Sequence, residues 1–163
     1  MRISSMFSIV LLAFLFTTTS CKKEETCNCI EDTDYLLFGH FYGECMGESC
    51  IEIFKLTDEA LFEDTVDQYP SSQSGYEGNF VPLDHATFTQ VADLINQVPD
   101  ALFNETEVVI GMPDAGDWGG FYVEVHRDGN VRFWLIDTMR GNIPEYLHDF
   151  TTAIENAIVA IND

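Results

Sequence analysis

An apolar run of ten residues near the N-terminus limits how much of this chain can fold in water. The run covers 7–16, follows the positive residue Arg2, and leads through small polar residues to Cys21. A helix that spans a bilayer needs about 20 apolar residues, so a run of this length is typical of a cleavable export signal. Residues 1–20 are therefore predicted to be a signal peptide. The remaining 143 of the 163 residues are enough for one domain with a proper core.

The residues at the end of this segment resemble a bacterial lipoprotein signal. A small residue, Ser20, stands directly before Cys21. The resemblance implies that residues 1–20 are a lipoprotein signal peptide and that the Cys21 sulfur is acylated, for example with palmitate. Cys21 would then be the mature N-terminus and the lipid anchor to a membrane. The alternative is an ordinary secretory signal, with Cys21 later joining a disulfide.

Residues 21–33 are interpreted as a tether between the anchor and the folded domain. Lys22-Lys23-Glu24-Glu25 resembles the short lysine-acidic-acidic signal that some Gram-negative lipoproteins use to reach the outer face of the outer membrane. That resemblance implies an outer-membrane lipoprotein of the cell envelope, displayed on the cell surface. A solvated charge run is the alternative interpretation.

The charge of the chain is strongly acidic. After removal of the signal, 28 acidic side chains face six basic ones, a net charge of −22 with histidine neutral. Nucleic acid is excluded as a partner, because phosphate binding needs clustered Lys and Arg. The acidic excess is expected to keep the domain soluble and away from anionic lipid. Calcium binding is the alternative, but the spacing of an EF-hand loop is absent.

The cysteines predict a disulfide in an exported protein. Cys27 and Cys29 are too close in sequence to pair comfortably with each other. Cys45 and Cys50 flank a glycine-containing loop, which favours a local Cys45–Cys50 bridge. The competing pairing joins the Cys27/Cys29 segment to that loop. A zinc site of four thiolates is a further alternative, which the oxidising compartment disfavours.

Hydrophobic patterning of the first half predicts strands followed by one helix. The strands are expected at 35–42, 50–55 and 60–63, and 69–75 reads as a loop. Asp84 is a good N-cap, and Pro99 would stop the helix that it starts. The buried stripe of that helix is predicted to be Phe88, Val91, Ile95 and Val98.

The second half repeats the order of strands and helix. A short strand at 108–110 and a hairpin of 121–127 with 131–137 precede a helix that begins near Pro144. The buried stripe of this helix is predicted to be Leu147, Phe150, Ile154, Ile158 and Ile161. A three-residue loop, 128–130, is expected in the hairpin. It pairs Val125 with Phe133 and Val123 with Leu135, and so keeps the apolar side chains on one face.

This order predicts an α+β fold in a single domain of residues 34–163. The expected architecture is a single antiparallel sheet with two amphipathic helices on one face. Segments 51–65 and 123–138 are alike, so a ββα duplication is a further hypothesis. The chain also resembles, in outline, small lipoprotein domains of unknown function that carry a Cys-x-Gly-x-x-Cys loop before the second strand, here 45–50. That likeness implies a fold and no activity.

No catalytic motif stands out in the chain. The histidines lack metal-ligand spacing, and there is no Gly-x-Ser-x-Gly nucleophile elbow. Asp114 and Asp117, in a glycine-rich loop, are the best acidic pair, and loop solvation explains them equally well. No cofactor, no metal and no catalytic residue is therefore assigned. His40 is interpreted as a structural histidine on a strand.

The favoured function is a membrane-tethered module that binds a protein or glycan. The expected hairpin register turns a set of polar and aromatic side chains away from the helices, and this set is the candidate binding face. Its members are Tyr122, Glu124, His126, Arg132 and Trp134. Aromatic residues and arginine commonly dominate binding energy. Alternatively, the tether or the 69–80 loop covers this face. The alternative function is a hydrolase-like envelope enzyme whose acidic residues assemble only in the fold.

Overall fold

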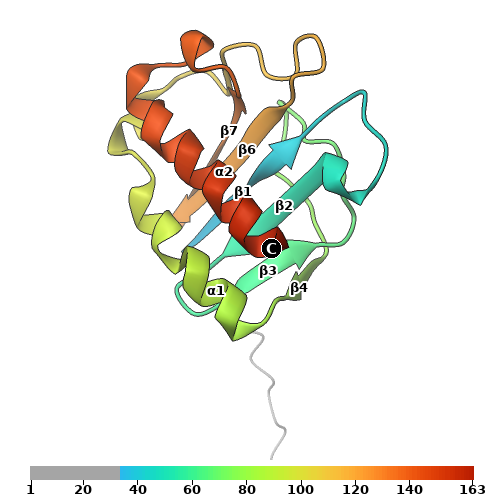
Figure 1. Cartoon of the computed structure of the whole chain (residues 1–163). Coiled ribbons are helices and arrows are strands. Elements are labelled where there is room, and N and C mark those ends of the chain that lie inside the picture. Colours follow the sequence, from blue (N-terminus) through green and yellow to red (C-terminus); the bar gives the residue numbers. More distant parts are fainter. Residues whose placement is uncertain (1–33) are drawn as a thin grey trace, which may run out of the picture. The chain divides into compact units, whose positions relative to one another are not determined.

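A seven-stranded sheet forms the centre of the computed structural model, which describes residues 34–163 (Figure 1). The strands are β1 (Tyr35–Phe41), β2 (Ile51–Leu56), β3 (Leu61–Asp64), β4 (Phe80–Pro82), β5 (Val109–Ile110), β6 (Gly120–Arg127) and β7 (Asn130–Asp137). Their order across the sheet is β4-β3-β2-β1-β6-β7-β5. The predicted α+β class is confirmed. The predicted signal peptide, the tether, Cys21, Cys27 and Cys29 lie outside the described residues.

The sheet is mixed, so the prediction of a purely antiparallel sheet is wrong. β5 pairs in parallel with β7, with Val109 opposite Leu135 and Ile110 opposite Ile136. The other neighbouring pairs in the described chain are antiparallel. Two chain reversals explain the parallel pair. The loop after β5 reverses the chain into β6, and the hairpin reverses it again into β7, which restores the direction of β5.

The first helix is shorter than predicted. Asp84 is the N-cap of α1 (His85–Val91), and its carboxylate accepts hydrogen bonds from the backbone N–H groups of Ala86 and Thr87. After Val91 the chain tightens into a 3-10 segment, η2 (Ala92–Gln97), rather than continuing as one α-helix. Val91 and Leu94 are buried three residues apart, the spacing of a 3-10 turn. A third short segment, η3 (Asp100–Asn104), follows Pro99.

The predicted C-terminal helix is present, but it begins four residues after Pro144, because a 3-10 turn comes first. α2 (His148–Asn162) follows two 3-10 turns, η4 (Arg140–Asn142) and η5 (Glu145–Leu147). A further 3-10 turn, η1 (Glu48–Cys50), lies in the first half of the chain, directly before β2. Phe150, Ile154 and Ile158 are buried at helical spacing, as predicted.

The hairpin register differs from the predicted one. Arg127 pairs with Asn130, so the loop contains two residues, and Val123 lies opposite Trp134. Asp128 and Gly129 both have positive φ, 52° and 74°, which is typical of the two-residue Asp-Gly turn that matches strand twist. The three-residue loop was expected because it gathers the apolar side chains on one face. That reasoning fails because β6 is buried on both faces, so either register places apolar side chains in a core.

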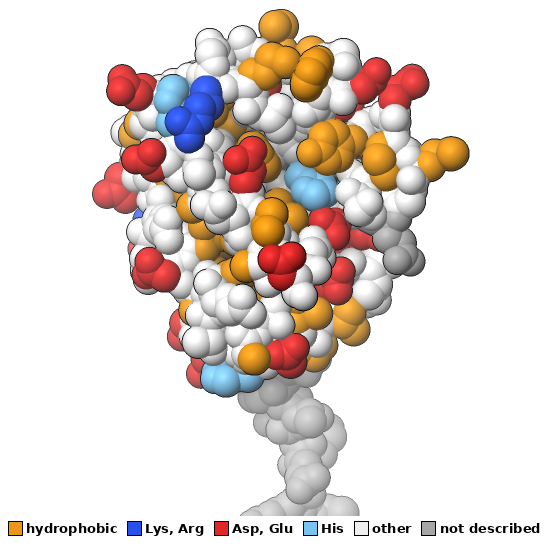
Figure 2. Space-filling model, in the orientation of Figure 1, with side chains coloured by type: hydrophobic (Ala, Val, Ile, Leu, Met, Phe, Trp, Pro, Cys, Tyr) orange, Lys and Arg blue, Asp and Glu red, His pale blue; other side chains and the backbone are white. Residues whose placement is uncertain are grey.

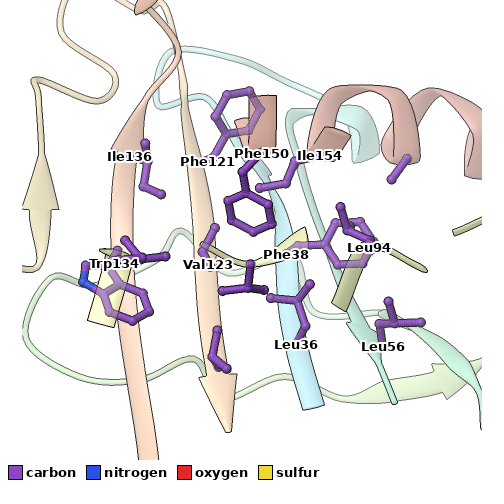
Figure 3. Packing of buried hydrophobic residues seen from close by; sticks show 14 of the residues in the cluster. Leu36, Phe38, Leu56, Leu94, Phe121, Val123, Trp134, Ile136, Phe150 and Ile154 are labelled. Carbon is purple, nitrogen blue, oxygen red and sulfur yellow. The ribbon is translucent and has the colours of Figure 1, made fainter. Parts of the chain in front are cut away.

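Two hydrophobic clusters flank the sheet. The larger one joins Val91 of α1 and Phe150 and Ile154 of α2 to sheet residues that include Phe38 and Val123 (Figure 3). The smaller one contains Leu37, Phe41, Ile53, Tyr122 and Leu135. Tyr76, from the segment between β3 and β4, and Phe80, the first residue of β4, pack against this smaller cluster. The second face of the sheet is thus a small core of its own.

Asp64 holds the segment between β3 and β4 in place. Its carboxylate accepts hydrogen bonds from the backbone N–H groups of Asp67 (3.0 Å) and Asn79 (2.5 Å). The Tyr76 hydroxyl donates to the same carboxylate at 2.7 Å. One buried side chain therefore closes both ends of the segment and fixes the tyrosine that packs on the sheet.

Candidate functional site

The structure divides the predicted binding face between the two sides of the sheet. Trp134 belongs to the larger cluster, and Tyr122 belongs to the smaller one. Glu124 and His126 are also buried. Arg132 donates hydrogen bonds to the carbonyl oxygens of Phe103 and Glu105, and its guanidinium carbon lies 5.0 Å from the Trp134 ring centroid. These five residues do not form one open surface, because the register that would group them is not the one adopted.

Glu124 is the centre of a buried polar network. Its carboxylate accepts hydrogen bonds from the hydroxyls of Tyr122 (2.6 Å) and Tyr35 (2.9 Å) and from the backbone N–H of Tyr76 (3.1 Å). Burial raises the pKa of Tyr122 well above its ordinary value, and the bond to the nearby Glu124 carboxylate adds to this. His126 stacks on the Tyr35 ring with centroids 5.1 Å apart. Because three donors satisfy the Glu124 carboxylate, we interpret the network as structural.

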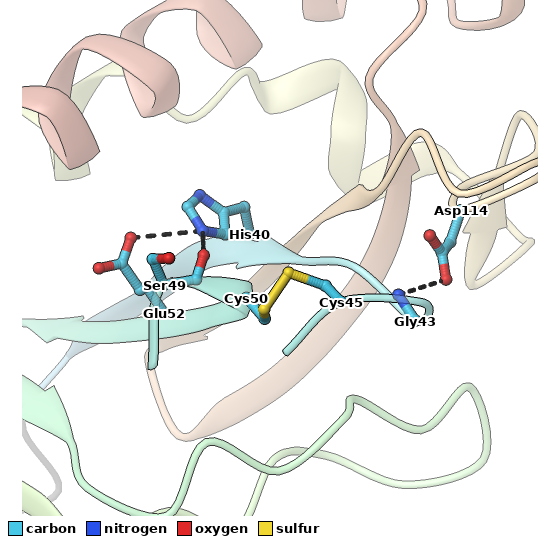
Figure 4. The surroundings of a disulfide bond; sticks show 7 residues. All are labelled: His40, Gly43, Cys45, Ser49, Cys50, Glu52 and Asp114. Carbon is cyan, nitrogen blue, oxygen red and sulfur yellow. Dashed lines mark hydrogen bonds and ion pairs between the residues drawn. A yellow bond between two sulfur atoms is a disulfide. The ribbon is translucent and has the colours of Figure 1, made fainter. Parts of the chain in front are cut away.

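The predicted Cys45–Cys50 disulfide is confirmed (Figure 4). Cys50 lies directly before β2, and its carbonyl accepts a 2.9 Å hydrogen bond from the N–H of Tyr42. The bond engages both sulfurs, so these two residues cannot supply thiolates to the alternative zinc site.

Asp114 and Asp117 have different surroundings. Asp114 accepts hydrogen bonds from the backbone N–H groups of Gly43 (2.9 Å) and Gly119 (3.1 Å) and from the Tyr69 hydroxyl (2.9 Å). Asp117 is exposed. Asp114 instead joins three loops at one end of the sheet: the loop after β1, the loop after β3 and the loop before β6.

A groove of about 490 Å³ lies beside this loop junction, between α2 and the ends of β1, β6 and β7. We call it the Trp118 groove. It is lined by His40, Tyr42, Trp118, Phe121, Thr138, Glu155, Asn156, Ile158 and Val159. Its volume is in the range of sites for small organic molecules.

Trp118 is the most exposed aromatic side chain of the groove, at 63 %. Its backbone is nevertheless held, since its carbonyl accepts a 3.1 Å hydrogen bond from the Thr138 hydroxyl. Gly119, at φ 72°, follows it, and a Cβ there would lie 2.3 Å from the Tyr42 ring. Glycine therefore allows the loop to approach Tyr42. Val159 of α2 adds another exposed apolar side chain. The groove combines large exposed apolar area with a fixed backbone.

His40 forms the polar wall of the groove. Its Nε2 lies 3.0 Å from the Ser49 carbonyl oxygen and 3.3 Å from the Glu52 carboxylate, as Figure 4 shows. The second ring nitrogen points away from both partners (Figure 4). The Asn162 amide donates to both oxygens of Glu52 at 3.1 Å. The end of α2 thus orients Glu52, and Glu52 and the disulfide loop together orient His40.

The face of the molecule drawn in Figure 2 is rich in acidic side chains. Figure 2 shows red carboxylates spread over it, whereas blue Lys and Arg atoms cover little of it. No group of three or more His, Cys, Asp or Glu in the described part of the chain is arranged to hold a metal ion. Nor is any helix within 34–163 both long and apolar enough to cross a membrane.

No protein-family model, no curated protein and no solved structure matches this chain. The residues themselves are therefore the basis for assigning a function.

Sequence reasoning missed Trp118, although one signal was present. A tryptophan in a loop of glycines and aspartates has few apolar neighbours along the chain, which is typical of an exposed aromatic residue.

Proposed function

We propose that the protein is a lipid-anchored, surface-displayed binding module of the cell envelope, with the Trp118 groove as the site for a protein or glycan ligand. The proposal combines the lipoprotein-like segment that ends at Cys21 with the folded domain, in which we propose that both helices cover one face of the sheet. The observation that carries it is Trp118, which remains 63 % exposed beside a groove although its backbone is fixed. Exposing a large aromatic side chain to water is unfavourable in free energy, and such exposed aromatic residues are typical of interaction sites.

A hydrolase-like enzyme is the second candidate, because the His40–Glu52 pair lies at the groove. We favour binding. The contacts of His40 are with the Ser49 carbonyl, Glu52 and the Tyr42 ring, and none of the described hydroxyl groups donates to it. A hydrolase of the serine type needs a nucleophile within hydrogen-bond reach of its base.

The anchor is tested by changing Cys21→Ser and separating membranes from soluble material. We expect the variant in the soluble fraction and the parent chain with the membranes. Variant material that still sediments with membranes would contradict the anchor. Surface display is tested separately by replacing Lys23, Glu24 and Glu25 with Ala. We expect the chain to lose its sensitivity to external protease on intact cells, and unchanged sensitivity would contradict surface display.

The groove is tested with the Cys21→Ser chain and envelope proteins and glycans as immobilised ligands. We expect Trp118→Ala to abolish binding and Trp118→Phe to retain part of it, because phenylalanine keeps an aromatic face. Met46→Ala is the matched control, since Met46 is 98 % exposed and does not line the groove. Binding that survives Trp118→Ala would place the site elsewhere.

A further inference from the structure

The lining of the Trp118 groove, as formed by the described residues, is largely apolar and contains one carboxylate, one histidine and no lysine or arginine. Tyr42, Trp118 and Phe121 supply aromatic rings, and the Tyr42 ring lies 5.2 Å from the His40 ring between centroids. Glu155 brings an exposed carboxylate from α2. Aromatic faces beside a carboxylate attract positive charge.

The basic side chains of the described domain are engaged elsewhere. They are Lys55 over the Tyr35 ring, Arg127 over the Phe103 ring and 3.7 Å from Asp100, Arg132 on the carbonyls of Phe103 and Glu105, and Arg140 on the Thr152 hydroxyl. None of these residues lines the groove. The groove therefore has no lysine or arginine partner from its own domain.

We propose that the groove binds a small organic cation with an alkylated ammonium head. This inference rests on the proposed function and specifies the chemistry of its ligand. The ammonium head would lie against the faces of Trp118 and Tyr42, with Glu155 balancing its charge. Such heads are bound by aromatic side chains because the ring face carries negative electrostatic potential. A groove of about 490 Å³ accommodates a small molecule of this kind.

Charge complementarity selects this occupant over neutral or anionic ones. The chain has a net charge of −21, which attracts cations to its surface, and Glu155 brings one carboxylate to the groove itself. An anion would meet this field and Glu155 with no lysine or arginine to offset them. A neutral molecule of the same shape would make the same apolar contacts but would lack the electrostatic attraction to the rings and to Glu155.

The test is calorimetric titration of the Cys21→Ser chain with choline and with 3,3-dimethylbutan-1-ol, its uncharged isostere. We expect choline to bind about five-fold or more tightly than the alcohol. Glu155→Gln should remove most of that preference without weakening the alcohol. The matched control is Glu59→Gln, which removes the same charge from an exposed position in the turn at the other end of β2. It should leave the preference intact.

The other outcomes separate the inference from the proposed function. If both probes bind equally and Trp118→Ala abolishes both, the cation inference is overturned while the groove remains a binding site. If N-acetyl-lysine methylamide binds more tightly than choline, the small cation is replaced by a basic peptide. If Glu59→Gln weakens choline as much as Glu155→Gln does, the effect is that of net charge and the assignment to the groove is overturned. Absence of binding by both probes also overturns the inference, whereas the proposed function depends on Trp118-dependent capture of envelope material.

Discussion

The hydroxyl of Tyr122 donates a 2.6 Å hydrogen bond to Oε2 of Glu124, two residues further along the same strand. Side chains at this spacing lie on one face of a strand, so the bond forms without any change of the backbone. Tyr35 of β1 and the backbone of Tyr76 donate to the same carboxylate. Glu124 therefore joins two strands and the segment that covers them.

Replacing Glu124→Ala should destabilise the domain by about 3–5 kcal/mol, because three donors would lose their acceptor in a buried site. Urea denaturation measures the free energy of unfolding. Tyr35→Phe is the comparison, since it removes one donor and leaves the carboxylate in place, at a cost of about 1 kcal/mol. Equal losses in the two variants would contradict the central role of Glu124.

Alkaline pH should destabilise the domain through its tyrosines. Burial, then the hydrogen bond to Asp114, raises the pKa of Tyr69 to about 12, and the pKa of Tyr122 is also raised. A raised folded pKa means that the folded state retains protons that the unfolded state has lost. This stability is complete below the unfolded pKa of 10.0 and is lost as pH rises through the folded pKa. Unfolding free energies measured above pH 10 should fall with pH, and Tyr122→Phe should flatten the fall.

Loss of the disulfide should cost little stability. The bridge joins Cys45 and Cys50, five residues apart, and a loop of this size corresponds to about 2 kcal/mol or less. The double change of both cysteines to serine should leave the domain folded. It should nevertheless weaken ligand binding in the groove, because the bridged loop presents the Ser49 carbonyl to His40. Melting curves and probe titration separate the two effects, and a domain that unfolds would contradict the prediction.

The sequence predicted the positions of the strands better than the side of the sheet on which each side chain lies. The positions of β1, β2, β6 and β7 follow from apolar patterning and agree with the structure within one residue, whereas α2 begins four residues after Pro144, where its start was predicted. The register of β6 with β7 did not follow, because Tyr122 and Val123 are both buried, on opposite faces. In such a strand, alternation no longer identifies the solvent side. The local turn chemistry of Asp128 and Gly129 decided the register instead.

The groove could not be predicted from the sequence because its residues come from separate parts of the chain. His40, Trp118 and Glu155 meet only after β1, the loop before β6 and α2 have packed. Each taken alone has an ordinary structural explanation. The disulfide was predictable because its two cysteines are close in sequence and their loop limits the geometry.

Acid should destabilise the domain through Asp137. Burial raises the pKa of Asp137, but hydrogen bonds from the N–H of Met139, the Asn142 amide and the N–H of Met112 outweigh this and lower it. A lowered folded pKa gives stability that is present above the unfolded value of 3.8 and is lost as pH falls through the folded pKa. Asp137→Asn should therefore show a shallower loss of unfolding free energy in this acidic range. An unchanged slope would contradict the assignment.

The two tryptophans offer the sharpest comparison in the domain. Trp134 is fully buried, with its ring centroid 5.8 Å from that of Phe103, whereas Trp118 is largely exposed. Trp134→Ala should cost about 3–5 kcal/mol, as expected for a buried aromatic residue replaced by alanine. Trp118→Ala should change the melting temperature little.

Binding should show the opposite order. Trp134→Phe retains a large apolar ring and removes an indole N–H that has no hydrogen-bond partner, so this variant should stay folded and bind ligand normally. Trp118→Ala should stay folded and lose binding. Thermal melting and ligand titration on the same samples measure both properties. A Trp118→Ala chain that melts far below the parent would mean that Trp118 stabilises the fold, and the groove would then lose the residue on which its assignment depends.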